Sequence, residues 1–276
     1  MNTRERHRMP LVRRVAELVA VLGATAIGCK EVGTSPEVPG SIELPPFPSP
    51  AVVVGDTLRN LAGAVAPMLA IVRNVAGDVI DKAPVRYLYA DFNRDSALLV
   101  DSLSGRVIAR KAISGDARLA ARVGSSLQVI RNLAVTIRPD SVERGASPSL
   151  FTTVFPDTGR SVNQSQPLTV SVRNLQGATP TGVNHWVVKF ELLRPANPSN
   201  DTSGAAFLID DRGSVSMLDT TDGSGQAGRR VRIRAARFPT TGTDTLELRA
   251  TVTYRGLPVR GSPVRLVAPV RRGSGG

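Results

Sequence analysis

The sequence predicts an all-β protein of two β-sandwiches in tandem, which follow a signal peptide and a Pro-rich linker. Three observations predict this architecture. Short segments after Pro50 alternate apolar and polar residues with the period of two that is typical of half-buried strands. The hexapeptide that starts at Val72 recurs in related form at Val172. No segment after Pro50 sustains a long amphipathic helical stripe, because Gly63 and Pro67 interrupt the nearest candidate.

Residues 1–28 are typical of a bacterial export signal. Five Arg lie in residues 1–14, and residues 18–27 form a run of ten without charge. Such a run is about half of the length that spans a bilayer, so we do not expect a stable transmembrane helix. A basic start, a short apolar stretch and small residues before a cleavage point together describe a signal peptide.

Cys29 is the only cysteine, and it directly follows those small residues. Residues 26–29, Ala-Ile-Gly-Cys, resemble the lipobox of bacterial lipoproteins, in which the Cys becomes the lipidated first residue. An exported protein tends to avoid a lone reactive thiol, so a Cys at the cleavage point favours lipidation. Lys30 resembles an outer-membrane sorting residue. Residues 24–26, Ala-Thr-Ala, fit ordinary secretion, which leaves a secreted or periplasmic protein as the alternative.

Residues 29–50 are expected to form a Pro-rich tether. Six Pro fall within residues 31–50. That density excludes a helix or a central strand and favours extended polyproline geometry, at about 3.1 Å per residue. With Cys29 acylated, the tether would hold the folded part away from a membrane, which is the partner predicted for the N-terminus.

Alternating polarity predicts strands throughout residues 51–268. The clearest strand is residues 245–255, whose even-numbered positions are apolar and whose odd-numbered positions are polar. Residues 185–193 repeat the pattern, with Trp186 inward and His185 outward. Further strands are expected at residues 68–73, 85–90, 97–101, 106–113, 117–123, 127–138 and 229–235.

A repeated turn motif predicts two units of similar size. Residues 72–77 read Val-Arg-Asn-Val-Ala-Gly, and residues 172–177 read Val-Arg-Asn-Leu-Gln-Gly. A spacing of 100 residues suits an immunoglobulin-size sandwich, which has about 100 residues. We therefore expect a sandwich over residues 51–138, a linker over 139–148, a second sandwich over 149–268 and a flexible tail over 269–276.

The turns also carry a family resemblance that covers about residues 50–268. The second unit resembles the bacterial Ig-like repeats of invasin- and intimin-type adhesins, and the first resembles the related Big-type domains. The resemblance implies immunoglobulin-like sandwiches that act as rigid spacers or adhesive modules and lack catalytic residues. Most domains of this kind fold without the inter-sheet disulfide, which agrees with the missing pair of cysteines. The matching stretches are residues 172–177, 187–193, 207–213 and 219–227 in the second unit and residues 54–58, 72–77 and 104–107 in the first.

The sequence favours neither an enzyme nor a cofactor. Gly223–Gly228 fits the G-x-G-x-x-G pattern of dinucleotide sites, but an alternating segment follows where such a site needs a helix N-terminus. A Gly-rich hairpin is therefore the preferred interpretation. His7 leaves with the signal, which makes His185 the only imidazole of the mature chain. No G-x-S-x-G elbow occurs, so a hydrolytic secreted enzyme is a less favoured alternative.

Four carboxylates raise the question of calcium. Asp210, Asp211, Asp219 and Asp222 lie within thirteen residues, and carboxylates on sandwich loops can hold Ca²⁺. The D-x-[DN]-x-[DN]-G pattern is absent, and Asp at a turn usually accepts hydrogen bonds from the backbone. We predict no metal site, with calcium binding by these four residues left as the open alternative.

The basic residues are spread along the chain, which favours a general preference for Arg over Lys, but three of them alternate along one predicted strand. Residues 1–28 carry five Arg and two Glu, so +9 of the net charge of +12 stays on the rest of the chain. Arg230, Arg232 and Arg234 share one sheet face about 6–7 Å apart, a spacing that suits a polyanion such as an acidic glycan. A solvated face, or charges that protect an edge strand, is the interpretation that we favour over polyanion binding. We do not expect nucleic acid as a partner, because stacking aromatic residues are scarce.

These patterns together predict an exported, lipid-anchored protein of the bacterial cell envelope, placed in the outer membrane. Its function would be that of a structural or adhesive module, with a cell-surface glycan or another envelope protein as the partner. The alternative is a polyanion- or glycan-binding module that uses Arg230, Arg232 and Arg234.

Overall fold

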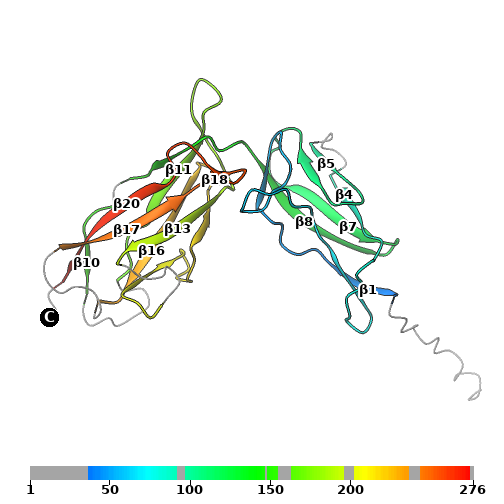
Figure 1. Cartoon of the computed structure of the whole chain (residues 1–276), viewed down its shortest axis with the longest axis horizontal. Helices are drawn as coiled ribbons and strands as arrows, with labels where there is room; N and C mark the ends of the chain where they lie inside the picture. The colour runs from blue at the N-terminus through cyan, green and yellow to red at the C-terminus, as the bar shows by residue number, and fades with distance from the viewer. Residues whose placement is uncertain are drawn as a thin grey trace, which may run out of the picture.

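The computed structural model describes residues 37–91, 97–146, 148–154, 163–195, 202–235 and 243–273. Figure 1 shows two sandwiches side by side, connected where β8 (Leu127–Thr136) leads into β9 (Ser141–Arg144). The described residues form strands and no α-helix, which confirms the all-β prediction. Within these residues we find no helix of the length and apolarity needed to cross a membrane.

The first unit has one four-stranded sheet, in the order β2-β8-β7-β4. Two small sheets, β1-β3 and β5-β6, lie opposite it and complete the sandwich. Its strands are β1 (Pro39–Glu43), β2 (Ala51–Val53), β3 (Ile71–Asn74), β4 (Arg86–Tyr89), β5 (Leu98–Val100), β6 (Val107–Ala109), β7 (Ala117–Val123) and β8.

The second unit has two five-stranded sheets. One has the order β10-β20-β17-β13-β15, and the other has the order β12-β11-β16-β14 with β9 paired to β11. A small hairpin, β18-β19, stands apart from both. The strands of the second unit are β9, β10 (Phe151–Thr153), β11 (Leu168–Asn174), β12 (Thr181–Gly182), β13 (Val187–Arg194), β14 (Ala206–Ile209), β15 (Leu218–Thr220), β16 (Gln226–Ile233), β17 (Thr243–Thr251), β18 (Thr253–Tyr254), β19 (Leu257–Pro258) and β20 (Val264–Arg272).

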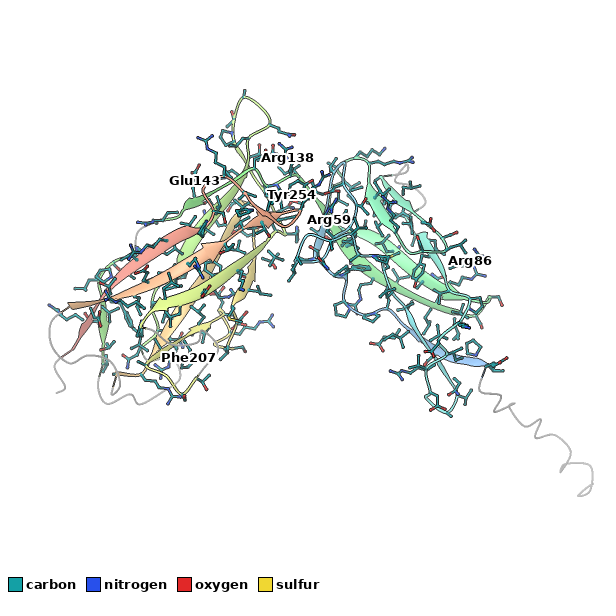
Figure 2. The ribbon with its side chains drawn as sticks, viewed as in Figure 1. Arg59, Arg86, Arg138, Glu143, Phe207 and Tyr254 are labelled. Carbon is teal, nitrogen blue, oxygen red and sulfur yellow. The ribbon has the colours of Figure 1, made fainter. Side chains whose placement is uncertain are left out.

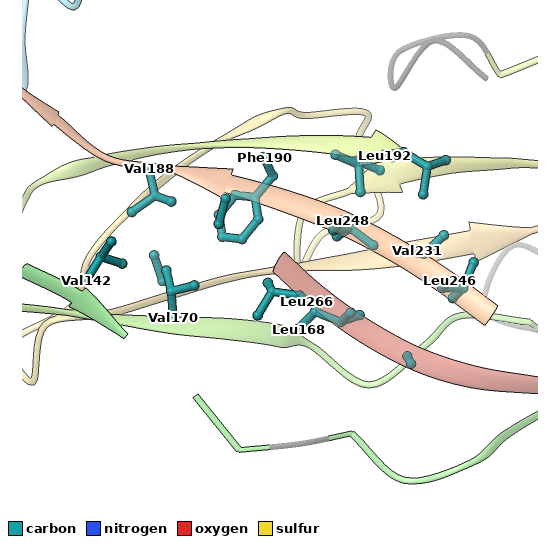
Figure 3. Close-up of a cluster of buried hydrophobic side chains, with 14 of the residues drawn as sticks. Val142, Leu168, Val170, Val188, Phe190, Leu192, Val231, Leu246, Leu248 and Leu266 are labelled. Carbon is teal, nitrogen blue, oxygen red and sulfur yellow. The ribbon is translucent and has the colours of Figure 1, made fainter. Parts of the chain in front are cut away.

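Each unit encloses its own apolar core, because alternate residues of its strands point inward. In the second unit Phe190 of β13 lies at the centre, between Val170 of β11 and Leu248 of β17 (Figure 3). All three side chains are fully buried. The smaller core of the first unit is built around Leu119 and Leu133. The two cores are separate, as expected for two sandwich units.

The Pro-rich segment is not a tether along its whole length. Pro39–Glu43 forms β1, which pairs antiparallel with β3. Leu44 is only 1% exposed, and its carbonyl oxygen accepts a hydrogen bond of 2.9 Å from Arg131 Nε. Residues 45–50 then carry the chain across to β2, which pairs parallel with β8 in the opposite sheet. The four Pro of this crossing lie between ladders, where no backbone N–H is required.

The second unit begins in the same way. β9 pairs antiparallel with β11, and β10 pairs parallel with β20. The predicted linker over residues 139–148 is therefore wrong where it includes β9, since Ser141–Arg144 is a strand of the second sandwich. The predicted tail over 269–276 is wrong at its start, because β20 continues to Arg272. Both boundaries were misplaced for the same reason: the ends of β9 and β20 are polar and are followed by Gly, so in sequence they resemble loops.

The repeated motif ends equivalent strands in the two units. Asn74 ends β3 and Asn174 ends β11, and both are buried. Asn74 Oδ1 accepts a hydrogen bond of 2.9 Å from the Asp78 backbone N–H, and Asn174 Oδ1 accepts one of 3.1 Å from that of Gln176. The Asn is needed because its short amide satisfies the backbone donors of the turn.

Replacing Leu44 tests whether the Pro-rich segment belongs to the first sandwich. Leu44→Ala is expected to lower the free energy of unfolding of the first unit by about 2–5 kcal/mol, because it leaves a cavity in the core. Urea unfolding of the full chain measures the change. Val38→Ala, at a position that is 44% exposed, serves as the control and should change it by less than about 0.5 kcal/mol. Equal, small effects of both substitutions would show that Leu44 is not packed.

Candidate functional site

A network of hydrogen-bonded polar and charged side chains lies where the two units meet. A loop of the first unit, residues 55–63, contacts the β18-β19 hairpin of the second unit. Figure 2 shows Arg59 and Tyr254 approaching each other from the two units. The hairpin closes with Arg255 and Gly256, whose φ angles of 53° and 79° fit the tight two-residue turn that matches strand twist.

Asp56 is the centre of this junction, with a side chain that is 4% exposed. Its Oδ1 accepts hydrogen bonds from the Thr57 backbone N–H at 2.8 Å and from Arg59 Nη2 at 3.1 Å. Its Oδ2 accepts from Arg59 Nε at 3.0 Å, from the Tyr254 hydroxyl at 2.9 Å and from Arg255 Nε at 2.9 Å. Both units therefore donate to one buried carboxylate.

Two opposing effects set the ionisation of Asp56. Burial by itself would raise the pKa of this carboxyl, but the hydrogen bonds from Arg59, Arg255, Thr57 and Tyr254 outweigh burial and hold the pKa far below its usual range. An acid with a depressed folded-state pKa contributes stability above its unfolded pKa of about 3.9. That contribution weakens as the pH falls below about 4. Burial raises the pKa of the Tyr254 hydroxyl, and so does its hydrogen bond to the Asp56 carboxylate.

The backbones of the two units also touch. A Cβ on Gly63 would lie 2.0 Å from the Gly256 backbone nitrogen, and a Cβ on Gly256 would lie 2.8 Å from the Ala62 carbonyl oxygen. Both glycines have positive φ as well, at 87° and 79°. Glycine is therefore required twice at this contact, for its conformation and for the close approach.

A second set of contacts fixes the connection between β8 and β9. Thr136 Oγ1 lies 2.7 Å from the Asn184 carbonyl oxygen and 2.8 Å from the Asn184 side-chain oxygen. Asp140 Oδ1 accepts a hydrogen bond of 2.6 Å from Arg138 Nε. Asp140 Oδ2 accepts from Asn174 Nδ2 and from the Leu175 backbone N–H, both at 2.9 Å. The short connection is thus tied to the second unit rather than left free.

A cavity of about 530 Å³, open to solvent, lies at the junction. Its walls come from both units, with Leu61 on one side and Trp186, Met217 and Leu218 on the other. Trp186 meets Tyr254 edge to face, with ring centroids 6.1 Å apart. Three cationic side chains and one carboxylate line the cavity, namely Arg59, Lys189 and Arg255 with Asp56.

Sequence reasoning missed this site. Asp56 and Arg255 are 199 residues apart. Asp56 lies in residues 54–58, which carry part of the family resemblance and predict no binding role. The Arg-Gly pair at residues 255–256, placed after an alternating strand, is the available signal of a tight hairpin. Nothing in the sequence indicates which carboxylate that hairpin meets.

The arginines singled out in the sequence lie elsewhere. Arg230, Arg232 and Arg234 are half-buried and project from the outer face of the sheet that contains β16. Arg230 Nε lies 3.4 Å from Asp211 Oδ1, and the Arg234 guanidinium carbon lies 6.0 Å from the centre of the Phe207 ring. Figure 2 places Phe207 at the end of the second unit away from the junction. Arg230, Arg232 and Arg234 therefore lie on one face of the second unit, as expected from their alternate positions.

The four aspartates are occupied by other contacts. Asp210 Oδ1 accepts from the Arg212 and Ser214 backbone N–H groups, and Asp222 Oδ1 accepts from those of Ser224 and Gln226. Asp219 pairs with Arg229 at 2.9 Å, and Asp211 pairs with Arg230. The described residues contain no group of three or more His, Cys, Asp or Glu side chains placed to hold a metal ion.

Two further predictions concern the Gly-rich segment and His185. Residues 221–225 join β15 in one sheet to β16 in the other, and residues 226–228 already belong to β16. The predicted hairpin is therefore wrong, although the strand expected after the Gly-rich segment is present. His185 is exposed, as expected, and its backbone N–H donates to the Thr221 carbonyl oxygen at 2.9 Å. Cys29 and the signal peptide lie outside the described residues.

Comparisons with known proteins do not assign the chain to a family. No family model matches the chain, and no curated protein matches it. Among solved structures it is similar to the adhesin InvE of Yersinia pseudotuberculosis, with 13% identity and a TM-score of 0.33 over 82% of this chain and 58% of that one. It is similar to the S-layer protein SbsC, with 10% identity and a TM-score of 0.29 over 86% of this chain and 28% of that one. It is similar to domains EC1-2 of human protocadherin-24, with 11% identity and a TM-score of 0.27 over 86% and 99%. Sequence identities and TM-scores this low carry no argument about function.

Removing the charge of Asp56 tests the junction. Asp56→Asn is expected to cost about 1–3 kcal/mol, because two guanidinium groups and a hydroxyl lose a buried, charged acceptor. The cost falls in the lower part of that range because Arg255 is half exposed to solvent. Urea unfolding measures the cost, and small-angle X-ray scattering measures the spread of distances between the units, which should widen.

Asp81→Asn is the matched control, since Asp81 is an exposed acid of the same unit. The two variants lose the same charge, so an equal effect on unfolding and scattering would contradict the role given to Asp56.

Proposed function

We propose that the chain is an exported, lipid-anchored structural and adhesive module of the bacterial cell envelope, and not an enzyme. The observation that carries the proposal is the built junction, in which Asp56 accepts hydrogen bonds from both sandwiches. A protein that holds a binding surface at a set distance from a membrane needs such a joint. A flexible linker between the units would not supply it.

The placement of the strands supports this proposal. In Figure 1, β1 lies at the end of the first unit that is remote from the second unit, and the last strand ends at the opposite end of the molecule. Nine residues lie between Cys29 and Pro39, and the chain from one to the other reaches up to about 35 Å when extended. An acylated Cys29 in the outer membrane would therefore leave the second unit directed outward, free to meet a cell-surface glycan or another envelope protein.

A second candidate function is polyanion binding by the arginine face, which consists of Arg230, Arg232 and Arg234. The observation that favours it is the placement of these three side chains. They come from alternate positions of β16 and the residue after it, and all three are half-buried on the same outer face of the sheet. A sulfated or carboxylated glycan would bind along this row of guanidinium groups.

Replacing Cys29 tests the anchor. In cells labelled with palmitate, the parent chain is expected to carry label and to sediment with membranes, whereas Cys29→Ser should lose the label and move to the soluble fraction. Loss of the acyl chains removes the hydrophobic contribution that holds a lipoprotein on the bilayer. A Cys29→Ser protein that stays with the membranes would exclude this anchor.

Heparin affinity tests the arginine face. The triple variant Arg230→Ala, Arg232→Ala, Arg234→Ala is expected to elute at lower salt, with the salt dependence of binding reduced by roughly one per lost contact. The control triple Arg194→Ala, Arg249→Ala, Arg265→Ala removes equal charge from the opposite sheet of the same unit and should change elution less. Equal shifts would show that net charge alone governs retention.

A further inference from the structure

The cavity at the junction has the features of a binding site that the proposed function does not use. Its volume of about 530 Å³ falls within the range of roughly 300–1,000 Å³ that is usual for small-molecule sites. It also lies between two structural units, where such sites are frequent. The hydrogen bonds from Tyr254 and Arg255 to Asp56 connect its two walls.

Apolar side chains form much of its wall. Leu61 from the first unit is 51% exposed, and Leu218 from the second unit is 43% exposed. Trp186 and Met217, which also line the cavity, pack with part of their surface on the core of the second unit. Large apolar residues that stay exposed around one cavity favour an occupant with an apolar body.

The charge of the cavity is positive. Asp56 is the carboxylate of the lining, and its two oxygens already accept five hydrogen bonds. Arg59 and Arg255 are both bound to it, which leaves one positive charge of that group uncompensated. Lys189 is exposed on the outer side of β13 and adds a second positive charge. The lining therefore complements an anion and repels a cation.

We propose that this cavity binds an anionic amphiphile, a monocarboxylate with an aliphatic or aromatic body. The carboxylate would lie against Lys189 and Arg255, and the apolar body would lie between Leu61 and Leu218. Because the two apolar walls belong to different units, the bound molecule would add contacts across the junction and raise the thermal stability of the full chain.

Titration calorimetry with decanoate, at concentrations below micelle formation, tests the proposal on the full chain. Decanoate is expected to bind saturably and to raise the melting temperature. Decanol should bind at least about tenfold more weakly, because it lacks the charge, and decyltrimethylammonium should not bind. Equal affinity for the three amphiphiles, or the absence of saturable binding of decanoate, would overturn the proposal.

Two pairs of variants locate the bound molecule. Lys189→Glu should weaken decanoate binding by about tenfold or more, whereas Lys82→Glu makes the same charge change at an exposed position of the first unit outside the cavity. Leu61→Ser should weaken it as well, whereas Leu257→Ser changes a residue that is 71% exposed and outside the cavity lining. All four positions are exposed, so the variants should fold. Equal effects within either pair would place the binding elsewhere and overturn the assignment.

Discussion

The relation between the two sandwiches depends on a carboxylate, that of Asp56, which is buried where their loops meet. A buried charge is costly unless it is fully hydrogen-bonded, and here five donors from two units satisfy it. Separating the units would expose Arg255 and Tyr254 to water but would leave Asp56 with Thr57 and Arg59 alone. The pKa of Asp56 is low for the same reason, because the hydrogen bonds of the assembled junction stabilise the charged carboxylate by more than burial destabilises it.

Much of the architecture could be predicted from the sequence, because it rests on local patterns. The alternation in residues 117–123 corresponds to β7 residue for residue, and that of residues 245–255 corresponds to β17 and β18. The repeated Val-Arg-Asn motif, which predicted two units, ends β3 in the first unit and β11 in the second. Each of these signals depends on near neighbours in the chain, namely the period of two and the chemistry of a turn.

The errors arise where a local pattern has two structural outcomes. Prolines in residues 45–50 look the same whether they extend a tether or carry a strand from one sheet to the other. What distinguishes the two is the burial of Leu44, which is a property of the folded core. The Gly-rich segment likewise resembles a hairpin, but in a sandwich a tight turn also serves to change sheets. The contacts of Asp56 join residues nearly 200 positions apart, and no pattern of neighbours records them.

The crossing of the first strand has a mechanical consequence. In each unit the strand after the crossing, β2 or β10, runs parallel to the strand at the end of that unit, β8 or β20. A force that pulls the two ends of a unit apart would draw these partners in opposite directions along their shared axis. The ladder would then be loaded in shear, so that its hydrogen bonds resist together instead of opening one by one. The same parallel pairing occurs in both sandwiches, so tension along the chain would load both ladders in this way.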